Sequence, residues 1–574
     1  MLLENKVVVV TGGAGLLGKA FVKQILISGG VAILTDIKTT SAKGFISKMK
    51  RDYPNNFYAT KMDITKKLSI NSVIKIVSKK FGGIDCLVNN AYPKNKNFGK
   101  QVEDVSYRDF SDNLSTHVGG YFLTSQQFGI FFKKHKGGNI INMGSVLALK
   151  SKDHTIKKDV YVDDKYNGLP LFYRFNVGQI YSPIGQTLTL PVNNPSNFKI
   201  AFCSCSNYPA GFFNAYESIA DDKSIDLVLH LGDYIYEYGK NGYATEDSKR
   251  LGRVVNPKHE IVSLKDYRLR HAQYKSDKQL KKLHSLKPMI CIWDDHEFTN
   301  NAWKHGAENH NKDEGLYKAR KVNAIKAYYE WMPIRETQSK SKIWRSFKVG
   351  NLFQLLMLDT RIYARNKQVD IEKYFKNGSF NKKAYLNALN NPNRNLLGKK
   401  QLDWLDNQVS SSFQWSIFGQ QLLSAPTYVP GFLKTLDVKT LPSYLHRYIS
   451  LAGTNIPYNT DQWDGYPKER ERFYKIISKS KSSVVIGGDT HSSWVSNLYS
   501  KEKKFVGVEL GTPSINSPNF VDVPIFNKNI NKLEESFINE NKNLQWMDGK
   551  NKGYTLIDIN KEFIDTSFIY VSSV

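Results

Sequence analysis

Apolar runs with the length of a strand recur along the chain, and most of them end at once in glycine or polar residues. The first run, Val7 to Val10, is continuously apolar, as a strand buried on both faces should be. A glycine turn, a helical pattern and a second apolar run ending at Asp36 follow it. This order of strand, helix and strand predicts an α/β domain with a parallel sheet over residues 1–150.

Three glycines stand where the first helix is predicted to begin. Gly12, Gly15 and Gly18 are spaced three apart, and small residues there let a pyrophosphate approach the N–H groups at the positive end of a helix. Asp36 closes the second strand, where a carboxylate accepts hydrogen bonds from a ribose and repels an added phosphate. The combination predicts a dinucleotide site that prefers NAD to NADP.

Three further motifs extend the pattern: "MDIT" with Asp63, "IDCLVNNAY" with Asn90, and "GNIINMGSV" with Ser145. With them, about residues 4–148 resemble the cofactor half of the short-chain dehydrogenase/reductase family. The resemblance implies a Rossmann-like domain, contacts to NAD from Asp63 and Asn90, and a Ser–Tyr–Lys active site. In that site the tyrosine exchanges a proton with the substrate, while the lysine lowers the tyrosine's pKa and holds the nicotinamide ribose.

The sequence departs from that family after Ser145. Its Tyr-x-x-x-Lys pair, Tyr161 and Lys165, lies in "DVYVDDKYNG", where alternation followed by a turn predicts a hairpin instead of the family's helix. His117 aligns with the family's helical asparagine, and the last strand and substrate-binding helices are missing. We therefore expect a half-domain that either binds NAD or is a remnant, without reductase activity.

A second pattern begins near residue 196. Six apolar runs are each followed at once by residues that bind ligands: "KIAFCSCSN", "DLVLHLGDYIYE", "MICIWDDHE", "FQLLMLDTR", "WSIFGQQ" and "SVVIGGDTH". In α/β folds the carboxyl ends of strands form the crevice where ligands bind, so six such runs can build one site. For the acidic stretch "DDHE" alone, a solvated turn is the competing interpretation.

The residues after these runs suit two neighbouring cations. Asp233 and Tyr236 are three apart in a turn, and a phenolate suits a ferric ion while a carboxylate can bridge two ions. Cys205 offers a thiolate, although a lone cysteine is more often a small buried apolar residue.

The other candidates are harder donors. Asp295 offers a carboxylate to a second cation, with His296 beside it facing the substrate. Asp489 and His491 are two apart, which puts both side chains on one side of an extended segment. Singly, each has a structural alternative, but their common position after strand-like runs favours a dinuclear metal site.

At these motifs the sequence resembles the alkaline phosphatase D family of calcineurin-like and purple-acid-phosphatase-like metallophosphoesterases. The resemblance covers about residues 155–570 and includes "SCSN", "LGDYIYEYG", "WDDHEFTNN", "LDTR", "FGQQ" and "GGDTHSSW". It implies a four-layer α/β/β/α domain and an Fe³⁺–Ca²⁺ pair. Position by position, iron would take Cys205, Asp233, Tyr236 and His491, and calcium would take Asp233, Asp295 and Asp489.

The same resemblance implies hydrolysis of phosphodiesters, and of monoesters more loosely. His296 would donate a hydrogen bond to a non-bridging phosphate oxygen or a proton to the leaving alkoxide, and Arg361 would brace the phosphate through its forked donors. Asn300 and Gln420 are expected in the second shell or at calcium.

Composition adds limits on partners and compartment. The formal net charge is +28, but the lysines are scattered and no nucleic-acid motif accompanies them, so we expect a phosphoester substrate without a specific nucleic-acid site. The four cysteines form no disulfide framework, and no apolar run has the length of a membrane span. The start "MLLENKVVVV" does not match a signal peptide, which favours the cytoplasm although the phosphatase family is usually exported.

The sequence thus predicts three parts: an NAD-binding half-domain at 1–150, a β-rich linker at 151–195 and a metallophosphoesterase domain at 196–574. A gene fusion explains this order. The main hypothesis is a metal-dependent phosphoesterase with an inactive reductase fragment. The alternatives are an NAD-dependent oxidoreductase with a phosphatase-like appendage, and a binding module in which neither reaction runs.

Overall fold

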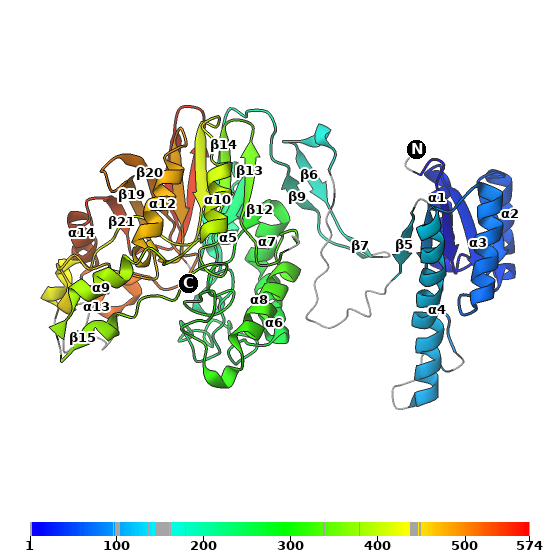
Figure 1. The fold of residues 1–574 in the computed structure, drawn as a ribbon, viewed down its shortest axis with the longest axis horizontal. Coiled ribbons are helices and arrows are strands. Elements are labelled where there is room, and N and C mark those ends of the chain that lie inside the picture. The colour runs from blue at the N-terminus through cyan, green and yellow to red at the C-terminus, as the bar shows by residue number, and fades with distance from the viewer. Residues whose placement is uncertain are drawn as a thin grey trace. The chain divides into compact units, whose positions relative to one another are not determined.

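The protein is described by a computed structural model of the 574-residue chain. The described residues are 3–95, 97, 104–135, 137–143, 160, 162–177, 180–336, 339–377, 379–436, 446 and 449–572. The chain forms two compact units, residues 1–150 and 151–574 (Figure 1).

The N-terminal unit contains one parallel sheet in the order β3-β2-β1-β4-β5. Its strands are β1 (Val7–Thr11), β2 (Val31–Asp36), β3 (Phe57–Lys61), β4 (Cys86–Asn89) and β5 (Asn139–Asn142). The helices between them are α1 (Leu16–Ile27), α2 (Lys43–Asp52), α3 (Lys67–Phe81) and α4 (Tyr107–Lys134). This order confirms the predicted Rossmann-like parallel sheet.

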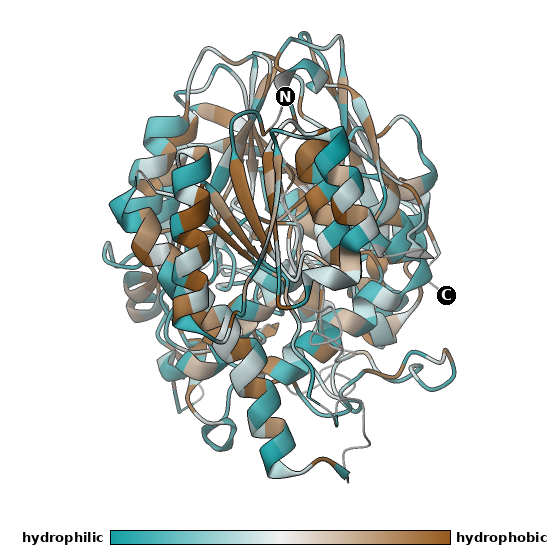
Figure 2. Cartoon of the chain, turned by 90° about the vertical axis from the view of Figure 1, so that its right-hand side faces the viewer, coloured by the Kyte–Doolittle hydropathy of each residue, from teal (hydrophilic) through white to brown (hydrophobic). Residues whose placement is uncertain are grey.

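Strand β1 is buried on both faces, as its unbroken apolar run predicts. Val9 packs with Ile33 in one hydrophobic cluster, and Val8 and Val10 pack in the other cluster on the opposite face. Apolar strands lie between helices whose outer faces are hydrophilic (Figure 2). A parallel sheet needs this cover on both faces.

Two short antiparallel pairs begin the second unit. Strands β6 (Pro170–Tyr173) and β9 (Gly185–Leu188) pair, as do β7 (Asn176–Val177) and β8 (Ile180–Tyr181). The predicted hairpin therefore starts later than "DVYVDDKYNG". Lys165 instead lies in the short 3-10 helix Asp164–Tyr166, because the Asp163 carboxylate accepts a hydrogen bond from the Lys165 N–H (3.1 Å). Tyr161 lies outside the described residues.

Two mixed sheets form the centre of the second unit. The first, in the order β12-β11-β10-β22-β23, contains β10 (Phe198–Cys203), β11 (Leu227–His230), β12 (Met289–Cys291), β22 (Gly553–Ile559) and β23 (Ile564–Tyr570). The second, in the order β13-β14-β17-β18-β20-β19-β21, contains β13 (Arg345–Val349), β14 (Phe353–Met357), β17 (Trp415–Gly419), β18 (Ser483–Gly487), β19 (Ser493–Tyr499), β20 (Phe505–Gly511) and β21 (Leu544–Asp548). The six predicted apolar runs correspond to β10, β11, β12, β14, β17 and β18.

Alternating side chains of β14 show how the layers are arranged. Leu355 and Met357 join a cluster with residues of the first sheet, whereas Leu356 joins a cluster with the helices α10 (Lys399–Gln408) and α12 (Pro467–Ile477). On the other side, the first sheet is covered by α5 (Asn214–Asp221), α6 (Leu264–Ser276), α7 (Lys278–Leu286) and α8 (Tyr317–Trp331) (Figure 1). The order is helix, sheet, sheet, helix.

Three further helices of the described chain pack near β19 of the second sheet. They are α9 (Lys382–Leu389), α13 (Pro524–Asn527) and α14 (Ile530–Glu540), and they share a third hydrophobic cluster with Trp494 of β19. The short pair β15 (Phe375–Lys376) and β16 (Ser379–Phe380) packs beside it.

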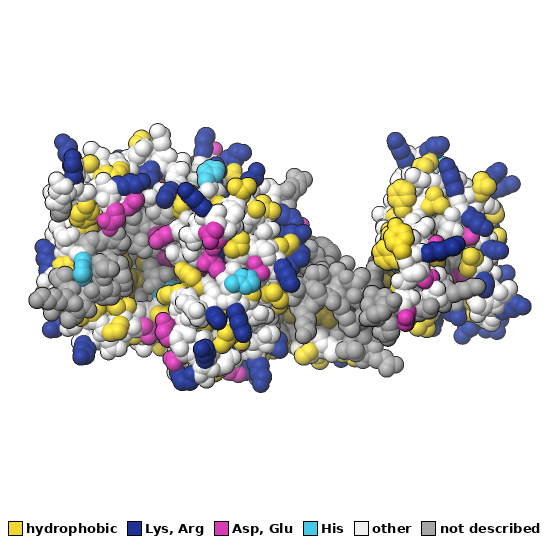
Figure 3. Space-filling model, turned by 90° about the horizontal axis from the view of Figure 1, so that it is seen from below, with side chains coloured by type: hydrophobic (Ala, Val, Ile, Leu, Met, Phe, Trp, Pro, Cys, Tyr) yellow, Lys and Arg dark blue, Asp and Glu magenta, His cyan; other side chains and the backbone are white. Residues whose placement is uncertain are grey.

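The surface charge and the character of the helices concern the predicted anionic substrate and the predicted absence of a membrane span. Lys and Arg side chains are scattered over the visible face in Figure 3, in line with a diffuse attraction to anions. Among the helices that the structure describes, none has both the length and the apolar character needed to cross a membrane.

Candidate metal centre

The residues that follow the parallel strands meet at one place. Three groups of potential ligands each have donor atoms within 4.8 Å of one another. They are Cys205, Asp233 and His491; Asp233, Asp295 and His296; and Asp294, Asp295 and Asp489. Because the groups share Asp233 and Asp295, they form one continuous cluster of donors.

One half of the cluster contains the softer and aromatic donors. The Asp233 carboxylate lies 3.5 Å from the Cys205 Sγ and accepts a hydrogen bond from the Tyr236 hydroxyl (3.3 Å). That hydroxyl is 3.2 Å from His491 Nε2. Ser517, which the sequence analysis missed, donates to the Tyr236 oxygen (2.9 Å). Thiol, phenol, imidazole and carboxylate thus surround one point, a donor set that fits a ferric ion.

The tautomer of His491 is fixed by a backbone group. Its Nδ1 lies 2.6 Å from the Pro518 carbonyl oxygen, to which it donates a hydrogen bond. Nε2 is then an unprotonated donor atom directed at Asp233 and Tyr236. Metal-binding histidines are typically oriented in this way.

The other half of the cluster contains oxygen donors. Asp295 is buried, and its Oδ2 accepts a hydrogen bond from the Asn301 N–H (2.5 Å). Its Oδ1 has no hydrogen-bond partner among the described residues. A buried carboxylate oxygen without a hydrogen bond needs a cation nearby, and the Arg361 guanidinium, 3.5 Å from Oδ1, meets part of that need. The oxygen-rich set of Asp233, Asp295 and Asp489 fits calcium.

Four of the ligand residues adopt a backbone conformation that side chains other than glycine rarely take. Their φ angles are +61° for Cys205, +53° for Asp233, +62° for Asp489 and +59° for His491. Such residues cost roughly 1–3 kcal/mol each and cluster at functional sites. Here the conformation occurs in the loops after β10, β11 and β18, where the side chains meet at the cluster.

Two buried glutamates hold the loops in place. Glu297 accepts hydrogen bonds from three backbone N–H groups, those of Asp233 (3.0 Å), Tyr234 (2.6 Å) and Asp294 (2.6 Å). Glu237 lies 2.6 Å from His296 Nδ1 and accepts from the Asn300 N–H (2.8 Å). The first ties two strand ends together, and the second orients the His296 ring so that Nε2 is left for a ligand.

Arg361 is placed differently from the sequence-based expectation. Its guanidinium is fully buried and donates to Asp294, to Asp461 (2.5 Å) and to Asp489 (2.5 Å), with Asp295 3.5 Å away. Each of the three guanidinium nitrogens donates to a carboxylate. This geometry favours neutralisation of the acidic cluster over the phosphate contact that the sequence analysis predicts.

Asn300 and Gln420 lie near the cluster in supporting positions. Gln420 is fully buried, and its side-chain oxygen accepts a hydrogen bond from the Trp463 indole N–H (2.9 Å). The contact gives Gln420 a structural role beside Trp463. Asn300 lies at the rim, half-buried.

Charges within the cluster shift several pKa values. Burial and the neighbouring acids raise the pKa of Asp233 well above its usual range, and burial raises that of Asp489 to about 6 against the opposing charge of Arg361. Burial lowers the pKa of His491 to about 4 and, together with Asp233, raises that of the Cys205 thiol. The cluster contains more carboxylates than the single positive charge of Arg361 can neutralise. Such an excess of carboxylates favours the binding of cations.

His296 and Glu237 form a buried ion pair beside these acids. Burial lowers the pKa of His296, but Glu237 and Asp233 outweigh it and raise that pKa well above its usual value. Burial likewise opposes ionisation of Glu237, yet the charge of His296 lowers its pKa to about 2. The pairing with Glu237 thus favours the protonated form of His296 in the donor cluster.

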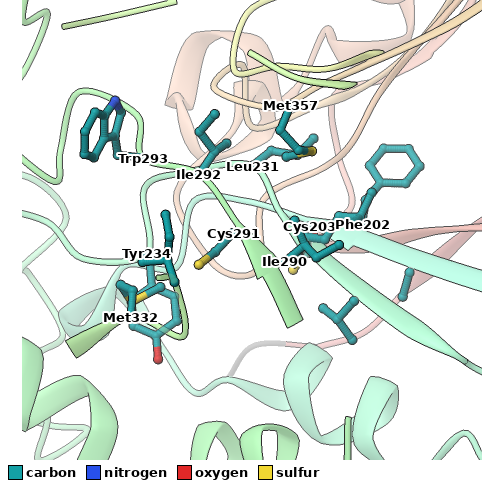
Figure 4. Close-up of a cluster of buried hydrophobic side chains, with 14 of the residues drawn as sticks. Phe202, Cys203, Leu231, Tyr234, Ile290, Cys291, Ile292, Trp293, Met332 and Met357 are labelled. Carbon is teal, nitrogen blue, oxygen red and sulfur yellow. Dashed lines mark hydrogen bonds between the residues drawn. The ribbon is translucent and has the colours of Figure 1, made fainter. Parts of the chain in front are cut away.

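The strands beneath the cluster are anchored in the hydrophobic core. Figure 4 shows Cys203, Cys291 and Trp293 among the packed apolar side chains, all of them fully buried. Cys203 and Cys291 are thus small core residues, whereas Cys205, two positions beyond Cys203, turns into the donor cluster.

The N-terminal unit retains the predicted glycine turn. Gly12 has a φ of +62°, and a Cβ there would lie 2.7 Å from the Ala91 Cα. Among the described residues, a Cβ on Gly15, the residue just before α1, would meet only the Gly12 carbonyl oxygen within 4 Å, so these residues leave the space before the helix open. In the part of the chain that the structure describes, no side chain caps this end of α1.

Two of the other predicted cofactor residues, Asp36 and Asn90, contact the same turn. Asp36, at the end of β2, accepts hydrogen bonds from the N–H groups of Ala14 (3.2 Å) and Lys38 (3.0 Å). Asn90 donates to the carbonyl oxygens of Thr11 (3.0 Å) and Gly12 (3.1 Å). Asp63 follows β3 and caps the turn at Thr65. Ser145 lies outside the described residues.

Comparison with known proteins gives the family of the second unit. Residues 200–568 match the family model described as PhoD-like phosphatase. The chain belongs to this family. It is 37% identical over 392 residues to alkaline phosphatase D of Bacillus subtilis, an alignment that covers 66% of this chain and 61% of the relative. A solved structure titled "Structure of PhoD" aligns with a TM-score of 0.55 and 33% identity, covering 70% of this chain and 71% of the other.

The N-terminal unit matches a second family model, described as short chain dehydrogenase, over residues 6–157. It is 38% identical over 149 residues to post-translational flagellin modification protein A of Campylobacter coli, covering 26% of this chain and 58% of that protein. The chain thus spans about three fifths of each curated relative. Both resemblances inferred from the motifs, and their order along the chain, are confirmed.

Proposed function

We propose that the second unit hydrolyses phosphate esters, phosphodiesters in particular, with two cations held by the donor cluster. The observation that carries the proposal is the meeting of Cys205, Asp233, Asp295 and His491 from the ends of four different strands. Iron would be held by Cys205, Asp233, Tyr236 and His491, and calcium by Asp233, Asp295 and Asp489. When bound, two such cations supply Lewis acidity and an activated water for in-line displacement at phosphorus.

The protein's own groups do the remaining work. Asp233 lies in two of the donor groups and is the natural bridge, and the Tyr236 hydroxyl orients its carboxylate by donating a hydrogen bond. Arg361 limits the repulsion among the acids and keeps Asp489 in position. His296, held through Nδ1 by Glu237, can donate from Nε2 to a phosphate oxygen or protonate the leaving alkoxide.

Hydrolysis of a chromogenic diester tests this function. Purified protein should cleave bis(p-nitrophenyl) phosphate, lose the activity after chelation and dialysis, and regain it with iron and calcium together. Activity that survives exhaustive chelation would rule out the proposed chemistry.

Replacing the proposed proton donor should have an effect that depends on the leaving group. We expect His296→Asn to lower kcat by roughly 10²–10⁴ for diesters with alkyl leaving groups, since general acid catalysis is worth about that much. The loss should be much smaller for p-nitrophenolate, which leaves without a proton. Rates for both substrates measure this.

The same substitution at His259, an exposed histidine paired with Asp266, is the matched control and should leave both rates unchanged. An equal loss of rate with both leaving groups would argue against proton donation by His296.

A second proposal concerns the N-terminal unit, which we infer binds NAD without reducing a substrate. The open space before α1 and the carboxylate of Asp36 support it. We expect Gly15→Val to weaken binding of NADH at least tenfold in a fluorescence titration, because the side chain would occupy the space for the pyrophosphate. Gly15 has a φ of −75°, so valine should fit the backbone.

Gly44→Val, where an added Cβ would contact no other part of the described chain within 4 Å, is the control and should bind NADH normally. Equal affinity in Gly15→Val, or steady turnover of NADH with carbonyl substrates, would contradict the proposal.

A further inference from the structure

A cavity of about 240 Å³ opens beside the donor cluster. Its lining includes Asp489 and Thr490 of the loop that carries two of the proposed ligands. We propose that this cavity receives the ester group that stays on the phosphate during hydrolysis of a diester, and that it selects an uncharged ring-sized group. The inference rests on the proposed function and adds a substrate class to it.

The wall of the cavity is attached directly to the ligand residues. Pro518, one of the lining residues, accepts the hydrogen bond from His491 Nδ1 (2.6 Å). Gln462, another, donates to the Asp489 carboxylate, and Trp494 donates to the Thr490 hydroxyl (2.9 Å). A phosphate held at the donor cluster would therefore have one of its ester oxygens facing the cavity.

The lining is aromatic and has no basic side chain among the described residues. Trp494, Phe520 and Tyr458 supply ring surface, with Trp494 and Phe520 6.5 Å apart between ring centroids. Of the two acids in the lining, Asp489 belongs to the donor cluster and Asp464 pairs with Arg470 (2.5 Å). Such a wall favours a flat apolar group and disfavours a second phosphate or a carboxylate.

Size restricts the occupant further. Pockets for drug-sized ligands occupy about 300–1,000 Å³, so this cavity suits a group of about one ring. The Thr490 hydroxyl accepts from Trp494, so its own proton is available to a polar atom on that ring.

Diesters that share one leaving group test the effect of the group that stays on the phosphate. Suitable substrates are the phenyl, methyl and 4-carboxyphenyl esters of p-nitrophenyl phosphate, all of which release p-nitrophenolate. The wild-type kcat/KM should be roughly tenfold or more higher for the phenyl than for the methyl ester, since burial of a ring supplies binding that a methyl group cannot. The carboxyphenyl ester should lose this advantage.

Filling the cavity should remove the preference. Thr427 is half-buried in the lining, and Thr427→Phe would occupy part of the space. We expect its phenyl-to-methyl ratio of kcat/KM to fall toward one, and the ratio cancels any general loss of activity. Thr435→Phe, the same change at an exposed residue outside the lining, is the control and should keep the wild-type ratio.

Binding of phosphonates gives a readout without turnover. Calorimetry on the metal-loaded protein should show phenylphosphonate binding roughly tenfold or more tighter than methylphosphonate, with the difference lost in Thr427→Phe. If this holds but no ester is cleaved, the proposed function fails, and only the preference of the cavity for a ring-bearing phosphonate stands. Wild-type protein that treats phenyl and methyl groups alike in binding and in rate, or a Thr427→Phe variant that keeps the wild-type ratio, would overturn it.

Discussion

Asp233→Asn should abolish diester hydrolysis, with a loss of roughly 10³-fold or more in kcat/KM, and should leave the purified protein depleted of metal. The carboxylate lies in two donor groups, 3.5 Å from the Cys205 sulfur and in contact with Tyr236. An amide carries no charge and bridges two cations poorly. Because positioning and charge neutralisation supply most of such catalysis, losing the bridge removes both.

Asn is nearly isosteric with Asp, so the fold should survive, and thermal unfolding checks this. Asp247→Asn, at an exposed carboxylate paired with Arg250, is the control and should retain activity and metal. A folded Asp233→Asn protein with normal metal content and activity would contradict the assignment of the bridge.

Arg361→Met should destabilise the protein by about 3–5 kcal/mol. Removing one partner of a buried ion pair typically has that effect, because charges are left without compensation. Here one guanidinium serves Asp294, Asp461 and Asp489, and Asp295 lies 3.5 Å away. The free energy of unfolding, measured by urea denaturation of metal-free protein, gives the size of the effect.

Adding metal should restore part of that loss, since cations would neutralise some of the same acids. Lys399→Met, which removes an exposed pair with Asp403 (2.9 Å), is the control and should change the unfolding free energy little. An Arg361→Met protein as stable as the wild type would show that Arg361 does not compensate the acidic cluster, and would reopen a role at the phosphate.

The sequence predicted the strands of the site because each is an uninterrupted apolar run that stops at a polar residue. The runs ending before Cys205, Asp233 and Asp489 are β10, β11 and β18, and the structure brings the loops after them together. Two rules were enough to predict the position of these loops. A strand buried on both faces is continuously apolar, and ligand sites form at the carboxyl ends of strands.

Other parts of the site gave no such signal. Asp461 and Gln462, which contact Arg361 and Asp489, follow no strand-like apolar run in the sequence, so the local pattern does not mark them. Ser517 is equally hidden, because its contact with Tyr236 joins residues far apart in the chain. Glu237 stands directly after "GDYIY" and could have been noticed from its position alone.

The sequence suggests a different role for Arg361 than the structure does, and the charges around it explain the difference. An arginine after a strand in a phosphatase suggests a phosphate contact, and only the structure shows several aspartates converging on its guanidinium. Similarly, the turn at Lys165 is set by the Asp163 side chain, a local hydrogen bond that alternation of polar and apolar residues does not reveal.

Elemental analysis of the purified wild-type protein, combined with anomalous diffraction at the iron edge, tests the central claim most directly. The account predicts two cations per chain: iron beside Cys205, Asp233, Tyr236 and His491, and calcium beside Asp295 and Asp489. A protein that cleaves diesters with no bound metal, or whose metals lie away from these side chains, would contradict it.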